Sequence, residues 1–258
     1  MRESFKRIEE AYQDSFSPNS IIGEKDACGV GFIANVEGIE SNWILKQSLK
    51  GLTCMEHRGG CGGDSDSGDG AGILCSIPWE FFEKKINQEN KKDFERGLGM
   101  IFMPNNKEKI EECKSICDKE AEKLRVKNTF WRTVPVNNEI LGPLAKANAP
   151  FISQWFIYID KKGNQDTERL LFQLRKRIEK KIRESFKNHV GDCEFYFSSL
   201  SSQTVVYKGM VRSEILSEFY LDLKEENFKV SFSVYHRRFS TNTLPKWPLA
   251  QPMRFLGH

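Results

Sequence analysis

Short runs of apolar, β-branched and aromatic residues follow one another along this chain, and the helical segments between them keep no strict alternation with the runs. A regular strand–helix rhythm would favour a parallel sheet, whereas grouped strands favour antiparallel sheets covered by helices. The sequence therefore predicts an α+β fold with mainly antiparallel sheets. Strands are expected at residues 29–36, 73–78, 97–103, 129–136, 151–159, 193–199, 204–207 and 230–235, and helices at 43–55, 79–86, 106–125, 167–186 and around 215–219.

The bulk properties limit the class of protein. The 258 residues are enough for one large domain or two small ones. The net charge is only +3, from 39 basic and 36 acidic residues, which gives no support to a nucleic-acid or membrane-surface partner. No apolar run approaches the ~18–20 residues that span a bilayer. The first 27 residues lack a hydrophobic signal core and contain several acids, so we expect a cytoplasmic protein.

The chain has seven cysteines. The odd count and the missing signal peptide favour reduced thiols over a disulfide framework. Cys113 and Cys117 lie four residues apart on the apolar stripe of an expected helix, so we interpret both as core residues. Cys54, His57 and Cys61 form a Cys-x-x-His-x-x-x-Cys cluster that could hold zinc, but structural zinc sites use four ligands. A small zinc-stabilised protein is therefore the weaker alternative.

The segment from His57 to Gly72 is unusually rich in glycine. It matches a dinucleotide fingerprint poorly, because it leads into a strand instead of opening a helix, and no Walker lysine follows. We interpret it as a shaped surface loop whose acids cap turns. The basic residues of the helix expected at 167–186 are interspersed with acids, so a solvated helix face is favoured over a polyanion site.

Cys28 stands at the start of an expected strand, before Gly29 and Gly31. Such a thiol could be a core residue or a nucleophile at a strand tip. A cut between Ala27 and Cys28 would give one residue both a thiol and a free α-amine. The pKa of an α-amine is about 7.7–8.0, so the amine could serve as the general base of its own nucleophile.

A basic segment, His236–Arg237–Arg238–Phe239, closes the last expected strand. An arginine at a strand end can be an ordinary charge at the rim of a sheet. It can also offer its planar fork to the carboxylate of a substrate. By itself this pattern does not decide between the two.

Taken together, several stretches of the chain resemble the glutaminase domain of glutamate synthase, a class II glutamine amidotransferase with an N-terminal nucleophile. The matching stretches are residues 27–32, 57–59, 69–74, 198–210, 238–243 and 247–252, and they occur in the family's order over about residues 24–258. The resemblance implies a four-layer αββα sandwich of two mainly antiparallel sheets. It also implies that residues 1–27 are a leader, or propeptide, and that residues 28–258 are part of the amidotransferase domain.

The resemblance assigns roles to particular residues. Removal of the leader would leave Cys28 as the N-terminal nucleophile, whose thiolate attacks the side-chain amide of glutamine and releases ammonia. Arg238 would pair with the glutamine α-carboxylate, and Phe239, Thr241 and Asn242 would line the pocket. No metal and no cofactor are expected in this segment.

Other implications concern a longer parent protein. In full-length members, ammonia travels to a second site that aminates 2-oxoglutarate with FMN and an iron–sulfur cluster. The remainder of that chain and an electron donor, either ferredoxin or a small NAD(P)H-oxidising subunit, would be partners. In the family an Asn-Gly-Glu segment that supplies the oxyanion hole follows the point where this sequence stops, at Gly257–His258. We therefore expect a C-terminally truncated fragment with an incomplete fold. The alternative is a catalytically inert truncated or split module that only binds glutamine or a partner chain.

Overall fold

The computed structural model of the chain describes residues 29–55, 67–86, 94–124, 126–160, 166–186, 195–238 and 246–253. The expected leader 1–27 lies outside these residues. So do Cys28, His57, Cys61, Phe239, Thr241 and Asn242 among the residues singled out above.

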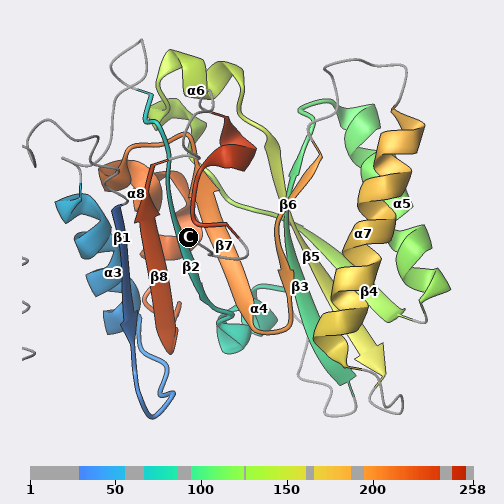
Figure 1. The fold of residues 1–258 in the computed structure, drawn as a ribbon, viewed down its shortest axis with the longest axis horizontal. Coiled ribbons are helices and arrows are strands. Elements are labelled where there is room, and N and C mark those ends of the chain that lie inside the picture. The colour runs from blue at the N-terminus through green and yellow to red at the C-terminus, as the bar shows by residue number, and fades with distance from the viewer. Residues whose placement is uncertain are drawn as a thin grey trace, which may run out of the picture.

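The strands form two antiparallel sheets (Figure 1). The strands are β1 (Gly29–Ala34), β2 (Ala71–Ser76), β3 (Phe94–Met103), β4 (Val126–Thr133), β5 (Phe151–Asp160), β6 (Tyr196–Ser201), β7 (Thr204–Gly209) and β8 (Phe232–Arg237). The first sheet has the order β1-β8-β2-β7 and the second the order β4-β5-β3-β6, four strands each. Strands far apart in the chain are therefore neighbours, and β1 and β8, the first and last, lie side by side.

Helices flank the two sheets (Figure 1). They are α3 (Asn42–Cys54), α4 (Trp79–Ile86), α5 (Lys107–Lys123), α6 (Pro143–Ala147), α7 (Thr167–Ser185) and α8 (Leu216–Phe219), with 3-10 turns η2 (Asn138–Ile140), η3 (Ser213–Ile215), η4 (Leu221–Lys224) and η5 (Trp247–Leu249). The long helices begin at side-chain caps, because Ser41, Asn106 and Asp166 each accept a backbone N–H of the first turn. In Figure 1, α3 lies beside β1 and β8, while α5 and α7 cover the far side of the second sheet.

Two apolar cores follow from this arrangement. One joins α3 and the first sheet to the inner side of the second sheet, and it includes Leu45, Ile73 and Phe156. The other lies between the second sheet and the helices α5 and α7, and it includes Trp155 and Leu174. The order of layers is thus helix, sheet, sheet, helix, which confirms the predicted α+β fold with two antiparallel sheets.

A buried polar network crosses between the sheets. Arg132 of β4 donates from both terminal nitrogens to Asp222, at 2.7 and 2.8 Å, and to Gln154 of β5 at 2.6 Å. The Gln154 amide donates to the hydroxyl of Tyr207 on β7 at 3.0 Å. That hydroxyl donates in turn to Asp222 at 3.2 Å. Every member therefore has partners, as a buried polar group requires.

Several predictions can be compared with the structure. Cys113 and Cys117 are fully buried on α5, which confirms them as core residues, and none of the four cysteines within the described ranges forms a disulfide. The basic face of α7 is exposed and ion-paired in part, as with Lys176 and Glu179. Arg175 departs from that interpretation, because it is only 6% exposed and packs over the ring of Phe172.

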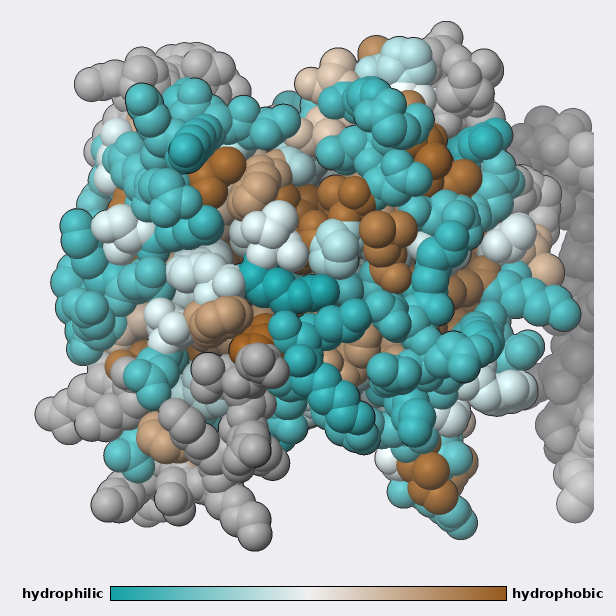
Figure 2. Space-filling model, turned by 180° about the vertical axis from the view of Figure 1, so that it is seen from behind, coloured by the Kyte–Doolittle hydropathy of each residue, from teal (hydrophilic) through white to brown (hydrophobic). Residues whose placement is uncertain are grey.

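The surface agrees with the near-balanced charge. Figure 2 shows the face opposite to that of Figure 1, where hydrophilic residues cover most of the area and hydrophobic ones gather between them. On the first sheet, by contrast, Val30 and Phe32 of β1 are 48% and 75% exposed. Among the helices described, none is long and apolar enough to cross a bilayer.

Candidate active site

The candidate site lies at one end of the first sheet, where the start of β1 meets the end of β8. Gly29 pairs with Arg237, Arg237 pairs with Ala71 on its other side, and Ala71 pairs with Gly209 of β7. Cys28 is covalently joined to Gly29, and Arg238 follows Arg237 directly. The sheet therefore brings the residue that follows Cys28 in the sequence, Gly29, beside the residue that precedes Arg238, which is Arg237.

Arg238 leaves β8 with an unusual backbone. Its φ is 120°, the only positive φ outside glycine among the described residues. Its N–H donates to the carbonyl of Gly70 at 2.8 Å, and its carbonyl accepts from the N–H of Gln251 at 3.1 Å. Strained residues of this kind are over-represented at functional sites. Both backbone groups are held, so the origin of the side chain is fixed relative to β2 and to the segment 246–253.

Two glycines at the start of β2 let Arg238 and the segment 246–253 lie close to the sheet. Gly70 also has a positive φ, 130°, and a Cβ there would lie 3.2 Å from the carbonyl oxygen of Arg238. A Cβ at Gly72 would lie 2.7 Å from the carbonyl oxygen of Gln251. Side chains at these two positions would push the segment 246–253 and Arg238 away from the sheet. Gly70 and Gly72, at the end of the glycine-rich segment, thus allow the backbone of Arg238 and of the segment 246–253 to pack closely against β2.

Arg237 takes a different role from its neighbour. Its side chain is fully buried and forms an ion pair with Asp69 at 2.9 Å. It also donates to the carbonyls of Gly70 and Val211, at 3.3 and 3.5 Å. Asp69 is only 7% exposed, so the interpretation of this end of the glycine segment as a surface loop with turn-capping acids is wrong. A buried arginine needs a charged partner nearby, and Asp69 supplies it.

His236 and Lys208 also lie at this end of the sheet. The two are cross-strand neighbours of Gly72, on β8 and β7 respectively. Both are buried, and Lys208 donates to the carbonyl of Pro248 at 2.8 Å, which ties the segment 246–253 to the sheet. Burial, with the nearby charge of Arg238, lowers the pKa of His236 to about 4. The imidazole is therefore neutral at neutral pH.

Of the expected site residues, the structure describes Arg238. Cys28, Phe239, Thr241 and Asn242 lie outside the described ranges, so their predicted roles stay predictions. Sequence reasoning missed Asp69, His236 and Lys208. An aspartate between two glycines before a strand is a pattern that could have indicated a buried turn. That His236 and Lys208 both pair with Gly72, by contrast, can be known only once the order of the strands is known.

Cys54 is one of the three residues of the possible zinc cluster. This residue is exposed at the end of α3, and the other members of its cluster, His57 and Cys61, lie outside the described residues. Within the described ranges, no group of three or more His, Cys, Asp or Glu side chains is placed to hold a metal ion. Burial raises the pKa values of Cys75 and Cys117, so these thiols stay protonated and inert.

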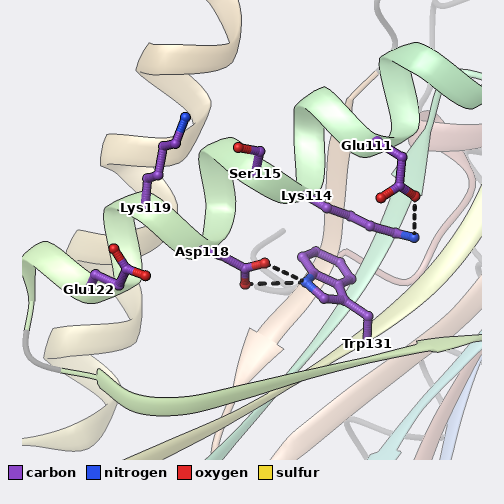
Figure 3. Close-up of a pocket in the computed structure, with 7 residues that line it drawn as sticks. All are labelled: Glu111, Lys114, Ser115, Asp118, Lys119, Glu122 and Trp131. Atoms are coloured by element: carbon purple, nitrogen blue, oxygen red, sulfur yellow. Dashed lines mark hydrogen bonds and ion pairs between the residues drawn. The ribbon is translucent and has the colours of Figure 1, made fainter.

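Two cavities lie elsewhere, on the second sheet. A groove of ≈ 490 Å³ runs along α5 beside Trp131 (Figure 3). Asp118 there accepts from the indole of Trp131 at 3.0 Å, and Lys114 is paired with Glu111 at 2.9 Å. A cavity of ≈ 340 Å³ lies between α7 and the β6–β7 hairpin, where Glu168 holds the turn through Ser201 and Ser202. These polar groups are engaged with one another, so we do not place the reaction in either cavity.

Comparison with known proteins points to one family. The family model described as "Glutamine amidotransferases class-II" matches residues 28–258. The chain is 49% identical over 242 residues to ferredoxin-dependent glutamate synthase 1, chloroplastic/mitochondrial, of Arabidopsis thaliana, covering 92% of this chain and 15% of that protein. It is 46% identical over 254 residues to the chloroplastic enzyme of Oryza sativa subsp. japonica, with 97% and 16% covered. Ferredoxin-dependent glutamate synthase 2 of a Synechocystis strain is 48% identical over 242 residues, with 92% and 15% covered. The chain thus spans about 15% of the length of these relatives.

Proposed function

Since the chain belongs to the class II glutamine amidotransferases, we propose that it hydrolyses the side-chain amide of glutamine with Cys28 as the nucleophile. The observation that carries the proposal is the junction of β1 and β8, which holds Gly29 opposite Arg237. Cys28 precedes Gly29 in the sequence and Arg238 follows Arg237, so this pairing supports placing the two functional groups near each other. A nucleophile and a carboxylate-binding cation would then lie on one sheet edge.

The chemistry follows from a mature N-terminus at Cys28. With residues 1–27 removed, the α-amine has an ordinary pKa near 8 and can take the thiol proton, directly or through a water. The thiolate attacks the amide carbon, and ammonia leaves with a proton returned by the amine. Water then resolves the γ-glutamyl thioester and gives glutamate.

Arg238 would bind the α-carboxylate of glutamine, because a guanidinium offers two parallel N–H donors to the two carboxylate oxygens. Its held backbone supports this role, since the point from which the side chain extends does not have to be ordered on binding. Phe239, Thr241 and Asn242 follow in the sequence and are proposed to line the pocket. A polar shell around the α-carboxylate would select glutamine over simple amides.

For the whole polypeptide, we propose membership of a glutamate synthase that passes ammonia to 2-oxoglutarate. The names of the relatives support ferredoxin as the electron donor over a small NAD(P)H-oxidising subunit. FMN and an iron–sulfur cluster would serve that second reaction. The described residues do not fit a metal cluster, so no step here is assigned to one. A cytoplasmic location stays a prediction, and the plant relatives carry chloroplastic names.

The test compares two cysteine variants in the polypeptide as the organism makes it. Cys28→Ser should lower glutamine-dependent activity by at least about a thousandfold and leave ammonia-dependent synthesis of glutamate in place. Cys54→Ser, which changes an exposed thiol on α3, is the matched control and should retain both activities. Mass spectrometry of the active protein should show an N-terminus at Cys28.

Two results would contradict the proposal. Equal loss of both activities in Cys28→Ser would indicate a structural cysteine. An active protein that keeps residues 1–27 would exclude a free α-amine as the base. Either result would leave the family membership intact and remove the mechanism.

A further inference from the structure

Arg237 and Asp69 form a buried ion pair to which the proposed reaction gives no role. The arginine is fully buried, the aspartate is 7% exposed, and their charged atoms lie 2.9 Å apart. A buried ion pair is weak evidence for stability, because the loss of hydration offsets much of the attraction. Its place in the chain suggests another use, since Arg237 directly precedes Arg238.

The guanidinium of Arg237 contacts more than its counterion. The Nη1 atom that faces Asp69 also donates to the carbonyls of Gly70, at 3.3 Å, and Val211, at 3.5 Å. We call Arg237, Asp69 and these two carbonyls the arginine clamp. The clamp joins three places that are far apart in the sequence: the end of β8, the residues just before β2 and the residues just after β7.

The backbone that leads to Gly70 is held on both sides. The hydroxyl of Ser67 accepts the N–H of Ala145 on α6 at 2.9 Å. At Gly68, an added Cβ would lie 2.3 Å from the carbonyl carbon of Val211, so the two backbones are in close contact. Asp69 follows these residues directly, and the clamp then fixes its side chain. The position of the Gly70 carbonyl is therefore set by several elements together.

The carbonyl of Gly70 links the clamp to Arg238. It accepts the N–H of Arg238 at 2.8 Å as well as the bond from Arg237. Arg238 has a φ of 120°, and such a conformation persists only where the surrounding structure over-determines it. Without the clamp, this carbonyl can move and the φ can relax to an ordinary negative value. That relaxation would turn the Cα–Cβ bond, and with it the guanidinium of Arg238, in another direction.

We propose that Arg237 and Asp69 are positioning residues, which hold the carbonyl of Gly70 and through it aim the side chain of Arg238 at the α-carboxylate of glutamine. The inference rests on the proposed function, because that function supplies the target of Arg238. Two parallel N–H donors bind a carboxylate well only when they are correctly oriented. A small misplacement therefore weakens substrate binding although the guanidinium is still present.

The experiment makes the same substitution in two buried ion pairs of the natural polypeptide. Lysine keeps the positive charge, but its ammonium ends about one bond short of the position of Nη1 and lacks the planar fork. Arg237→Lys should raise KM for glutamine about tenfold and keep kcat within about threefold. The matched control is Arg132→Lys, in the Arg132–Asp222 pair at 2.7 Å between the two sheets, and it should keep KM within about twofold.

Urea unfolding of both lysine variants separates positioning from general stability. A purely structural role predicts that KM follows the loss of stability in both variants. The proposal predicts that KM rises in Arg237→Lys alone, even where Arg132→Lys loses as much stability. An unchanged KM in Arg237→Lys, or an equal rise in the two variants, would overturn it. Where Arg237→Lys does not fold, Asp69→Asn replaces it, because asparagine keeps the shape and removes the charge, and the same rise is expected.

A double-mutant cycle shows whether the clamp acts through Arg238. Arg238→Ala should raise KM for glutamine by about 10–100-fold, and adding Arg237→Lys should change KM by no more than about twofold further. Additive effects on KM would overturn the positioning role. If Arg238→Ala leaves KM unchanged, the proposed binding of the carboxylate is wrong and the role of the clamp is lost with it. If Arg238→Ala raises KM and Arg237→Lys does not, only the role of the clamp is wrong.

Discussion

Arg238, the residue proposed to bind the substrate carboxylate, has a backbone conformation that residues with a Cβ rarely adopt. A φ of 120° disfavours every residue with a Cβ, by about 1–3 kcal/mol. The hydrogen bonds of its N–H to Gly70 and of its carbonyl to Gln251 hold it there. The strain therefore falls on the residue whose side chain we propose to bind the substrate.

Substitution can separate the strain from the side chain. Arg238→Ala and Arg238→Gly both remove the guanidinium, and both should raise KM for glutamine by about 10–100-fold, the value of a charged hydrogen-bonded pair. Only glycine relieves the backbone, so Arg238→Gly should be more stable than Arg238→Ala by about 1 kcal/mol in urea unfolding. Equal stabilities would show that the φ carries no strain.

His236 predicts a pH dependence of stability. Its pKa of about 4 in the folded chain lies below the ordinary value of about 6.5, so the unfolded chain binds more protons between these two pH values. Stability from this residue is therefore complete above pH 6.5 and is lost as the pH falls toward 4, by up to about 3 kcal/mol. Unfolding of the wild type and of His236→Phe at several pH values checks this. The variant should lack that part of the slope, and an unchanged slope would assign it to other groups.

The residues of the site were only partly predictable from the sequence. Arg238 was singled out with a resemblance to guide the choice, and the roles of Cys28, Phe239, Thr241 and Asn242 stay predictions. Arg237 looked equivalent to Arg238, yet it is buried against Asp69. Two adjacent residues on a strand point to opposite faces, and which face is buried depends on partners far away in the chain.

At the scale of elements, one aromatic ring packs between α3 and the first sheet. Tyr235 of β8 packs against Gly51 of α3 and Gly31 of β1, and a Cβ at either glycine would lie 2.6 Å or less from an atom of the tyrosine. Glycine inside a helix usually weakens it by about 1 kcal/mol relative to alanine. Here the missing side chain makes room for the ring.

A double substitution tests this packing. Gly51→Ala alone should destabilise the chain by about 1–3 kcal/mol, because the new methyl group meets the tyrosine ring. In a Tyr235→Leu background the same change should be neutral or stabilising by up to about 1 kcal/mol, because only the gain in helix propensity is left. A thermal unfolding cycle over the four proteins measures the coupling. Additive effects would mean that the ring and the glycine do not compete for space.

Helices were predicted closely, and strands less so. The helix at 79–86 has the predicted bounds, the other predicted helices differ by one or two residues, and the short helix α6 was not predicted. Strand β8 begins two residues later than expected and continues to Arg237, and β3 begins at Phe94 instead of Gly97. Helix ends are set by local caps such as Asp166, whereas a strand extends as long as its neighbour offers hydrogen bonds.

At the scale of the molecule, the Arg132–Asp222 pair joins the two sheets through Gln154 and Tyr207. Asp222→Asn should destabilise the chain by about 3–5 kcal/mol, because it leaves the charge of Arg132 inside without a counterion. Adding Arg132→Met should recover part of this loss, since the unpaired charge is then gone. Denaturant unfolding of both variants measures these free energies. A double variant no more stable than Asp222→Asn would show that lost packing, and not the unpaired charge, causes the destabilisation.

The fold class could be predicted from the sequence, whereas the order of strands could not. Grouped strands and amphipathic helices indicated an α+β fold with antiparallel sheets. The placement of β8 between β1 and β2 depends on contacts across some 200 residues, which no local pattern encodes. The site depends on that placement, because it joins Gly29 to Arg237.

Strand β1 lies at the margin of its sheet and pairs only with β8 in the described part of the chain. A peptide bond just before such an edge strand can be cleaved without breaking the hydrogen bonds that pair β1 with β8. If the proposed cleavage before Cys28 takes place, the first sheet would keep its strand order and the amine would be exposed without rearrangement of the ladder.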